Sequence, residues 1–367
     1  MITWDQFTER LQDRFADLPS IEILLFEVGV IVAGILTYRF LAARIEHVRG
    51  HLLLIALGMF LVEFFTGPMW TNQHLGPWAY VYSDVSWILT IGWTVLISLS
   101  IYVVDRVLRA KEPWQRYVLF LLIITPVTIV SDGLVRGLGI RESSPETAAA
   151  AGSAMFPIID VPVAGLYYVP VVMTLVYSFY RHWLPAIEPG AVTTGRLPLL
   201  NRLLLTTVAV VLFEVVVEPM ATNQGFPAWS YVFHDITVIM TGLWVLIVTG
   251  STLAVDRVLH TTDVRLKFAA YLTLITLIAA PIEAWFIQNG YRVYGPSATA
   301  DFIGLRTVIL DLPIEVLAAI PLYLSLVISF VRYWDGSVDR SLGFRAREAG
   351  EQARLAPSVA PPVAGQP

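Results

Sequence analysis

The chain has 367 residues, of which 56% are hydrophobic and only 14% are charged. Soluble domains carry about 25% charged residues, so this composition excludes a soluble globular protein and predicts an all-α polytopic membrane protein. The absence of cysteine excludes disulfides, thiolate nucleophiles and cysteine-bound metal centres. The net charge of −5 gives no indication of a nucleic-acid partner.

Apolar segments of the length that crosses a bilayer recur along the chain. Residues 1–16 are polar and amphipathic and lack the pattern of a cleavable signal. Nine transmembrane helices are predicted after them, at residues 20–43, 51–67, 84–104, 115–131, 160–181, 200–217, 235–255, 267–286 and 307–331. A Pro/Ala-rich tail, residues 335–367, is predicted to be disordered.

The basic residues predict an orientation. Most of the 24 lysines and arginines follow the first, third, fifth, seventh and ninth helices. Because cytoplasmic loops carry an excess of Lys and Arg, we expect the N-terminus outside the cell membrane and the C-terminus in the cytoplasm. The pairs Asp105–Arg106 and Asp256–Arg257 at the inner helix ends are interpreted as interfacial ion pairs.

An internal duplication organises the sequence. Residues 61–108 and 212–259 match without a gap at an offset of 151, including the Thr-Asn-Gln segments that start at Thr71 and Thr222. Asp160-Val161-Pro162 and Asp311-Leu312-Pro313 show the same offset. We therefore expect two parallel four-helix repeats, at 17–157 and 158–305, and a closing helix at 306–334.

Ionisable residues inside a membrane are candidate functional groups by default, and here they gather in the outer halves of the helices. The candidate catalytic residues are Glu63, Glu214, Glu218, Asp235, Asp160, Asp311 and Glu283. The candidate substrate-binding residues, polar or aromatic groups in the same layer, are Asp84, Asn72, Asn223, Trp78, Tyr80, Trp229, Tyr231 and His234.

These groups favour acid catalysis without a metal or another cofactor. The aspartate-rich runs that hold magnesium diphosphates are absent, and no histidine pair with metal-ligand spacing lies in the outer layer. A carboxyl group in a low dielectric stays protonated near neutral pH and can donate its proton. Aromatic faces stabilise cations, so an acid among Trp and Tyr residues suits protonation of an olefin or an epoxide.

Structural interpretations account for the same residues. Trp and Tyr belts are common at membrane interfaces. Glu63 and Glu214 could bond to neighbouring helices and fix their packing, and the Thr-Asn-Gln segments could hold turns through side-chain bonds to the backbone.

The two repeats differ in their ionisable groups. Glu218, His234, Glu283 and Glu315 of the second repeat are aligned with Gly67, Ser83, Thr128 and Ala164 of the first. We expect one composite site at the repeat interface, with the proton donor, Glu218 or Glu283, coming from the second repeat.

The arrangement resembles the membrane-integral cyclases of isoprenoid metabolism, namely lycopene cyclases built from two similar halves and small membrane-bound terpene cyclases. The shared features are a glutamate in the second helix (Glu63, repeated as Glu214), a later boundary aspartate (Asp160 and Asp311) and an outer loop rich in Trp and Tyr. The resemblance implies a metal-independent cyclase that protonates a prenylated substrate and starts carbocation cyclisation. It also implies a lipophilic small molecule as the partner, alongside membrane lipids.

Two other functions suit the same pattern. A sterol-isomerase-like enzyme would use the same protonation on a different substrate. A proton-coupled transporter or binder of a lipophilic molecule would use repeated units and intramembrane acids, but it needs polar groups through the full depth of the membrane. The inner halves of these helices are apolar apart from the Asp–Arg pairs, which favours the enzyme.

Overall fold

A computed structural model describes residues 19–355, except 83, 110–111, 153, 157–160, 189–196, 261–262 and 301, and describes side chains as far as residue 339. The first repeat contains α3 (Val48–Thr66), α4 (Trp87–Tyr102), α5 (Pro113–Gly137) and α7 (Gly165–Trp183). The second contains α8 (Leu199–Val217), α9 (Val238–Val258), α10 (Val264–Gln288) and α12 (Ile314–Leu355). Helix α2 (Ile21–Ala42) precedes both.

Among the described residues, eight of these helices are long and apolar enough to cross a membrane. The ninth, α7, has 19 residues and carries Arg181 and His182 in its last turn. The prediction of an all-α, multi-pass membrane protein is therefore confirmed, and about nine spans are supported.

The packing groups the helices differently from the predicted boundaries. Helix α7 packs on α3 and α5, and α12 packs on α8 and α10 in the same way. Helix α2 packs mainly on α4 and has no equivalent in the part of the second repeat that the structure describes. The repeats are thus α3–α7 and α8–α12, with α2 as an added N-terminal helix. The sequence did not decide this point, because a series of nine helices can be divided into two groups of four with the extra helix at either end.

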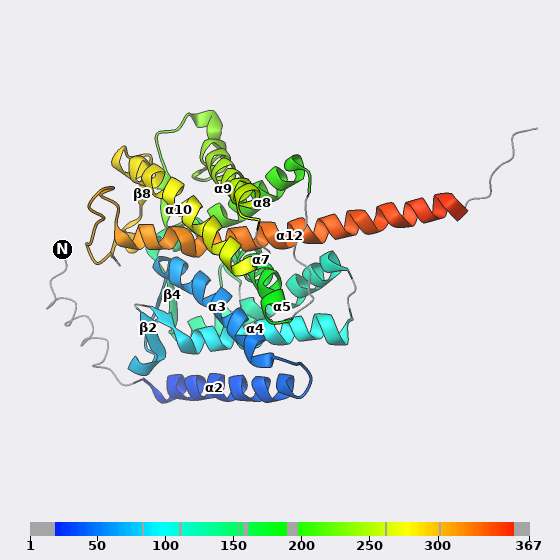
Figure 1. Ribbon diagram of the computed structural model, residues 1–367. Coiled ribbons are helices and arrows are strands. Elements are labelled where there is room, and N and C mark those ends of the chain that lie inside the picture. Colours follow the sequence, from blue (N-terminus) through cyan, green and yellow to red (C-terminus); the bar gives the residue numbers. More distant parts are fainter. Residues whose placement is uncertain are drawn as a thin grey trace, which may run out of the picture.

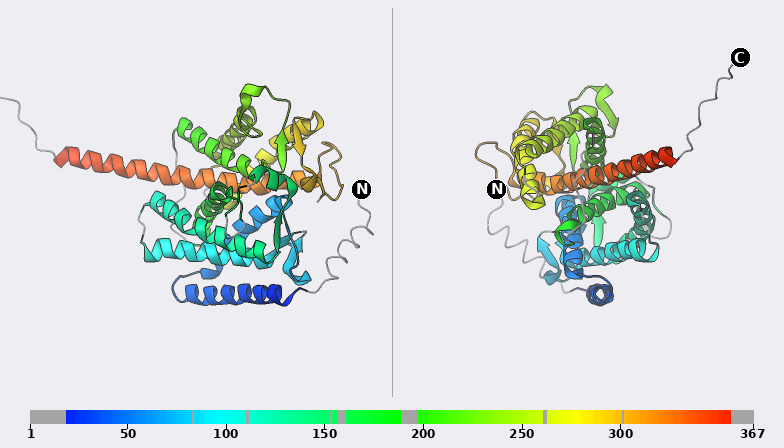
Figure 2. Two further views of the ribbon diagram at one scale, coloured as in Figure 1. Left: turned by 180° about the vertical axis from the view of Figure 1, so that it is seen from behind. Right: turned by 45° about the vertical axis from the view of Figure 1, so that its right-hand side comes forward.

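The repeats meet along α7 and α12, which form the most extensive helix contact of the structure. Helix α7 also touches α8, and α12 touches α3, so the contacts are reciprocal, as in a two-fold symmetric dimer. Figure 1 shows α12 running between the two groups of helices, with α2 at the far edge of the first, and Figure 2 shows the same division from two other sides.

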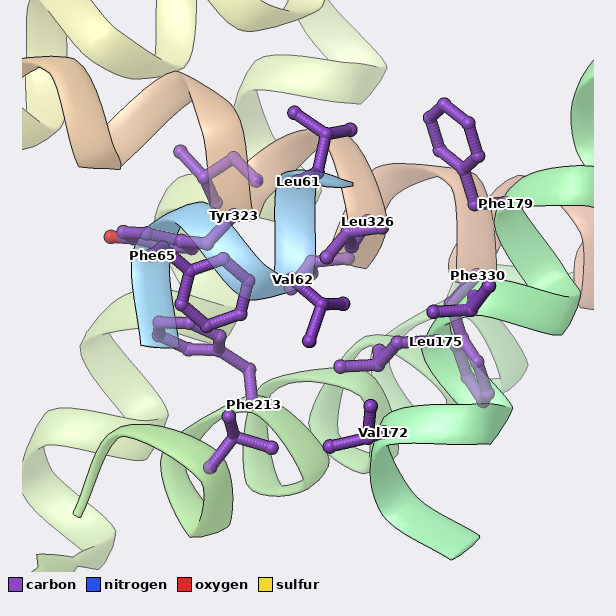
Figure 3. Close-up of a cluster of buried hydrophobic side chains, with 14 of the residues drawn as sticks. Leu61, Val62, Phe65, Val172, Leu175, Phe179, Phe213, Tyr323, Leu326 and Phe330 are labelled. Carbon is purple, nitrogen blue, oxygen red and sulfur yellow. The ribbon is translucent and has the colours of Figure 1, made fainter. Parts of the chain in front are cut away.

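Apolar side chains from both repeats fill this interface. Leu175 and Phe179 of α7 lie among residues of α3, α8 and α12, including their counterparts Leu326 and Phe330 (Figure 3). Van der Waals packing of this kind drives helix association in a membrane, where lipid tails are as apolar as the side chains.

Short strands form the end of the bundle where α3 and α8 terminate. Strand β1 (Trp70–Asn72) pairs with β4 (Arg141–Ser143), and β2 (Tyr80–Tyr82) pairs with β3 (Val85–Ser86). The second repeat has the same pairs, β5 (Ala221–Asn223) with β8 (Arg292–Tyr294) and β6 (Tyr231–Phe233) with β7 (Ile236–Thr237). Short helices α6 (Pro145–Ala151) and α11 (Pro296–Ala300) follow β4 and β8. The Thr-Asn-Gln segments therefore begin inside strands β1 and β5, and turns follow them.

Two further expectations are corrected. Helix α12 continues to Leu355, so the segment predicted to be disordered from residue 335 is helical up to that point, and residues 356–367 lie outside the described residues. At the other end of the bundle, Asp105 pairs with Arg181 of α7 at 2.8 Å, and Asp256 pairs with Arg332 of α12 at 2.5 Å. These pairs join two helices, in place of the adjacent Asp–Arg pairs that the sequence suggested.

We expect Gly58→Val to weaken the packing of α3 on α7. A Cβ at Gly58 would lie 3.0 Å from the ring of Phe179, so a branched side chain forces the helices apart. Overpacking of this kind costs about 1–3 kcal/mol. The measurement is the melting temperature in detergent. Gly29→Val is the control and should leave it unchanged, because an added Cβ at Gly29 would have no neighbour within 4 Å.

Candidate functional site

The strand pairs position polar side chains above the ends of the helices. The Asn72 side chain donates to the carbonyl of Asp84 at 2.6 Å and accepts from Nε of Arg141 at 2.9 Å, while the hydroxyl of Tyr80 donates to the Asn72 carbonyl at 3.1 Å. In the second repeat, the Asn223 side chain donates to the carbonyl of Asp235 at 2.8 Å and Tyr231 donates to the Asn223 carbonyl at 3.2 Å, but Oδ1 of Asn223 has no partner among the described residues. Asn72 and Asn223 thus hold turns, as the structural interpretation of the Thr-Asn-Gln segments expected, and Tyr80 and Tyr231 bond to the same turns.

Glu63 is buried near the end of α3 and bonds to α4. Its Oε2 lies 2.5 Å from the hydroxyl of Thr90, which also lies 3.0 Å from the carbonyl of Ser86. A hydroxyl carries one proton and can donate to only one acceptor. If Thr90 donates its proton to the Ser86 carbonyl, the short contact between Thr90 and Glu63 needs a proton on the Glu63 carboxyl group, which then donates to the Thr90 oxygen. The other oxygen of Glu63, Oε1, is buried and has no hydrogen-bond partner among the residues that the structure describes.

The second repeat reproduces this arrangement. Thr241 lies 2.5 Å from Oε2 of Glu214 and 3.0 Å from the carbonyl of Thr237, and Oε1 of Glu214 is also buried and unpartnered.

Glu63 lies on the wall of a cavity of about 130 Å³, which we call cavity 1. Its lining is mainly apolar and comes from α3, α5, α6, α7 and the end of α8. Three large aromatic side chains contribute, namely Trp70, Trp93 and Tyr168. Cavity 1 is therefore bounded by both repeats, as expected of a composite site.

Glu218, which follows α8, is the second glutamate that lines cavity 1. The ring of His234 lies 3.5 Å from its carboxyl group. Burial raises the pKa of Glu218 above its usual range, His234 opposes this increase, and Asp235 adds to it. Among the candidate catalytic residues, the structure thus brings Glu63 and Glu218 to one cavity.

An ion-paired group that the sequence reasoning missed completes the wall. Asp132 of α5 lies 2.7 Å from Nε of Arg136 and 3.5 Å from Arg141. The buried guanidinium of Arg141 lies 5.0 Å from the ring centre of Trp70 and 5.9 Å from that of Trp93.

The repeat offset could have revealed this group. Arg292 is 151 residues after Arg141, and Glu283 is 151 residues after Asp132. The alignment of Glu283 with Thr128 was wrong, so Glu283 is the counterpart of an acid and not a gain of the second repeat. Glu283 lies 3.3 Å from Arg292 and accepts a hydrogen bond from Tyr294 at 2.9 Å.

A second cavity, of about 350 Å³, occupies the equivalent place in the second repeat; we call it cavity 2. Gly67, Pro68 and Tyr82 line it where Glu218, Pro219 and Phe233 line cavity 1. Asp84 and Glu315 are its acidic residues. Glu214 is not among its lining residues.

Two aromatic rings line cavity 2 where two valines line cavity 1. Phe213 and Tyr323 stack with ring centres 4.0 Å apart, and both line cavity 2. Their counterparts in the first repeat are Val62 and Val172, which line cavity 1 and leave Glu63 accessible. Figure 3 shows both pairs within the same apolar cluster. The duplication has thus kept two buried glutamates, of which Glu63 lines cavity 1 and Glu214 is not among the residues that line cavity 2.

The remaining candidates lie elsewhere. Asp311 is exposed and pairs with Arg306 at 2.6 Å. Trp78 and Trp229 are exposed at 46% and 74%, which suits the interfacial belt better than a cavity wall. Asp235 adjoins His234 beside Glu218. Asp160 lies outside the described residues.

The chain matches no protein-family model, no curated protein and no solved structure. The geometry of cavity 1 is therefore the observation that bears on function.

We expect Glu218→Gln to reduce the dependence of stability on pH. Because the pKa of Glu218 is raised in the folded protein, its contribution to stability is fully present below the pKa of the unfolded chain and is lost as the pH rises through the folded value. As the pH rises above about 4, the usual pKa of a glutamate, the melting temperature of the wild type should fall relative to that of the variant. Equal pH slopes would contradict this expectation, and Asp311→Asn, at an exposed carboxylate, is the control.

Proposed function

We propose that the protein is a metal-independent membrane enzyme that protonates an olefin or epoxide of a prenylated, terpenoid-type substrate in cavity 1 and so starts carbocation cyclisation. The observation that carries the proposal is the unpartnered, buried Oε1 of Glu63 on the wall of a mainly apolar cavity. An apolar substrate can occupy such a space without losing hydrogen bonds, and no described side chain bonds to Oε1 of Glu63 in its place.

Glu63 acts as the proton donor in this proposal. Burial disfavours a charged carboxylate, and the single proton of Thr90 is satisfied by the Ser86 carbonyl when Glu63 is neutral. The proton passes from Glu63 to one carbon of a double bond, or to the epoxide oxygen, and leaves a cation on the substrate. Arg141 does not compete as the acid, because a guanidinium keeps its proton in proteins; its Nε and Nη1 face Asn72 and Asp132.

The walls and Glu218 complete the reaction. Trp70, Trp93 and Tyr168 offer aromatic faces, each of which stabilises a nearby cation by up to about 2 kcal/mol when water is excluded. Glu218 accepts the proton that the cyclised cation loses when its final double bond forms. The product is then an isomer of the substrate, and a proton returns from Glu218 through water to Glu63.

We also propose that the Arg-rich end of the bundle faces the cytoplasm, in the cell membrane, with the N-terminus outside. Cavity 1 then lies in the outer half of the membrane. A proton-coupled transporter of a lipophilic molecule is the second candidate, favoured by a separate polar cavity of about 290 Å³ at the opposite end of the first repeat.

The internal repeat provides a matched control for the acid. We expect Glu63→Gln to lower the conversion of prenyl and epoxy-prenyl substrates by at least about 100-fold, as for loss of a general acid. Glu214→Gln makes the same change beside Thr241, away from a cavity, and should retain activity within a few-fold. The assay uses membranes without added metal and detects products of unchanged mass, with a sterol panel for isomerase activity.

The contrary outcomes are distinct. Equal activity of wild type and Glu63→Gln would remove Glu63 as the donor. No conversion of any substrate by the wild type, together with pH-driven movement of a lipophile across proteoliposomes, would support the transporter in place of the enzyme.

A second variant pair tests cavity 1 as the binding site. Gly165 lines cavity 1, and a Cβ there would meet neighbours only at 3.6 Å and beyond, so Gly165→Leu fills the cavity with little strain on the backbone. We expect substrate binding, measured by retention of a radiolabelled prenyl substrate, to fall by about tenfold or more, since the new side chain occupies the space of the substrate. Val316→Leu alters the equivalent position in cavity 2 and should leave binding unchanged.

A further inference from the structure

The Arg-rich end of the bundle carries a similar ionic group in both repeats, with differences at two positions. In the second repeat, Arg332 and Lys267 pair with Asp256 at 2.5 and 3.5 Å. In the first, Arg181 and Arg116 stand at the equivalent positions and lie 2.8 and 3.8 Å from Asp105. Each acid–base group joins helices that are distant in sequence.

The second repeat adds a carboxylate that the first lacks. Asp335 is 1% exposed, lies 3.2 Å from Arg202 and 3.8 Å from Arg332, and accepts a hydrogen bond from the backbone of Leu197 at 3.0 Å. Its counterpart, 151 residues earlier, is Leu184. The counterpart of Arg202 is His51, so the first repeat lacks both members of this ion pair. Arg181 therefore has a leucine at the position where Arg332 has Asp335.

The place left by the absent carboxylate is hollow. A cavity of about 290 Å³, which we call the basal cavity, is lined by Leu184, Arg181, Arg116, Arg106 and Asp105. Arg181 is 8% exposed, and its Nε has no hydrogen-bond partner. The Nε of Arg332 is also unpartnered among the described residues. The repeats therefore differ in the Asp335 carboxylate and in the basal cavity, and not in the unpartnered Nε of the arginine.

The other lining residues decide the charge and the polarity of the occupant. Glu188 also lines the basal cavity, 3.1 Å from His51, which in turn lies 2.8 Å from the hydroxyl of Tyr180. Three arginines thus face two carboxylates, one of which is engaged by a histidine. The ends of α2 and α3 contribute an apolar wall of Leu41, Ile45, Val48, Leu52 and Ile55.

We propose that the basal cavity binds the phosphate of an anionic phospholipid, whose acyl chains run along the apolar wall of α2 and α3. The phosphate takes the place that the Asp335 carboxylate fills in the second repeat and receives charge-assisted hydrogen bonds from Arg181 and Arg116. Basic pockets between transmembrane helices bind lipid head groups for the same reason. Free phosphate shares the head-group chemistry but gains nothing from the apolar wall.

Native mass spectrometry of the purified, delipidated chain tests this site, with phosphatidylglycerol, phosphatidylcholine and inorganic phosphate as the probes. We expect one tightly held phosphatidylglycerol, retained at least about fivefold better than phosphatidylcholine. Leu184→Asp supplies the absent carboxylate internally and should abolish this preference. Leu184→Asn, of the same size without the charge, should keep it.

A second pair of variants leaves Leu184 in place. Arg116→Gln should weaken phosphatidylglycerol binding by about fivefold, whereas Lys267→Gln, at the equivalent position of the second repeat, should not. Equal retention of the two lipids, or equal binding by Leu184→Asp and Leu184→Asn, would overturn the proposal. If the protein binds inorganic phosphate and shows no preference between the two lipids, the ligand is a soluble anion, and the proposal of a phospholipid is overturned. None of these outcomes depends on the activity of cavity 1.

Discussion

The packing of α7 against α12 is the contact on which the rest of the structure depends. Each helix completes its own repeat and also touches the other repeat, so a single apolar interface sets both the internal packing and the two-fold relation. Glu146 of α6 and Ser297 are equivalent at the repeat offset, and the side chain of Glu146 accepts a hydrogen bond from the backbone of Ser297. Residues at equivalent positions thus meet across the interface, as in an isologous dimer. Fusion of the two copies into one chain then leaves each free to change separately.

Separate change is visible at both ends of the bundle. At the strand-capped end, the first repeat has two valines where the second has Phe213 and Tyr323, and Glu63 lines cavity 1 whereas Glu214 is not among the residues that line cavity 2. At the Arg-rich end, Asp335 fills a place that Leu184 leaves hollow. In the first case both repeats keep a cavity, but different side chains line it. In the second case a carboxylate of the second repeat occupies a place that is hollow in the first. The two-fold scaffold therefore allows equivalent places to differ between the repeats.

Some of the site could be predicted from sequence. The fixed offset identified Glu63 and Glu214 as a repeated pair, and the count of acids indicated where polar groups gather. The partners of these acids were less accessible. Arg141 and Asp132 have the counterparts Arg292 and Glu283 at the repeat offset, so the sequence contains this acid–base pair twice. The pairing of Glu283 with Thr128 hid this repetition. Asp105 appeared to pair with the adjacent Arg106, whereas the fold brings Arg181 to it from a helix 76 residues away.

By itself, the sequence determined that this is a multi-pass helical membrane protein built from a parallel duplication, because apolar length and fixed-offset identity are properties of the chain alone. It also located most helices to within a few residues, since the change from apolar to polar residues marks their ends. Only the tertiary structure decided where each repeat begins, which of the two glutamates faces a cavity, and which arginine each aspartate binds. These outcomes depend on side-chain volumes and helix contacts between residues far apart in sequence, such as Val62 with Val172 and Phe213 with Tyr323, and no local pattern records them.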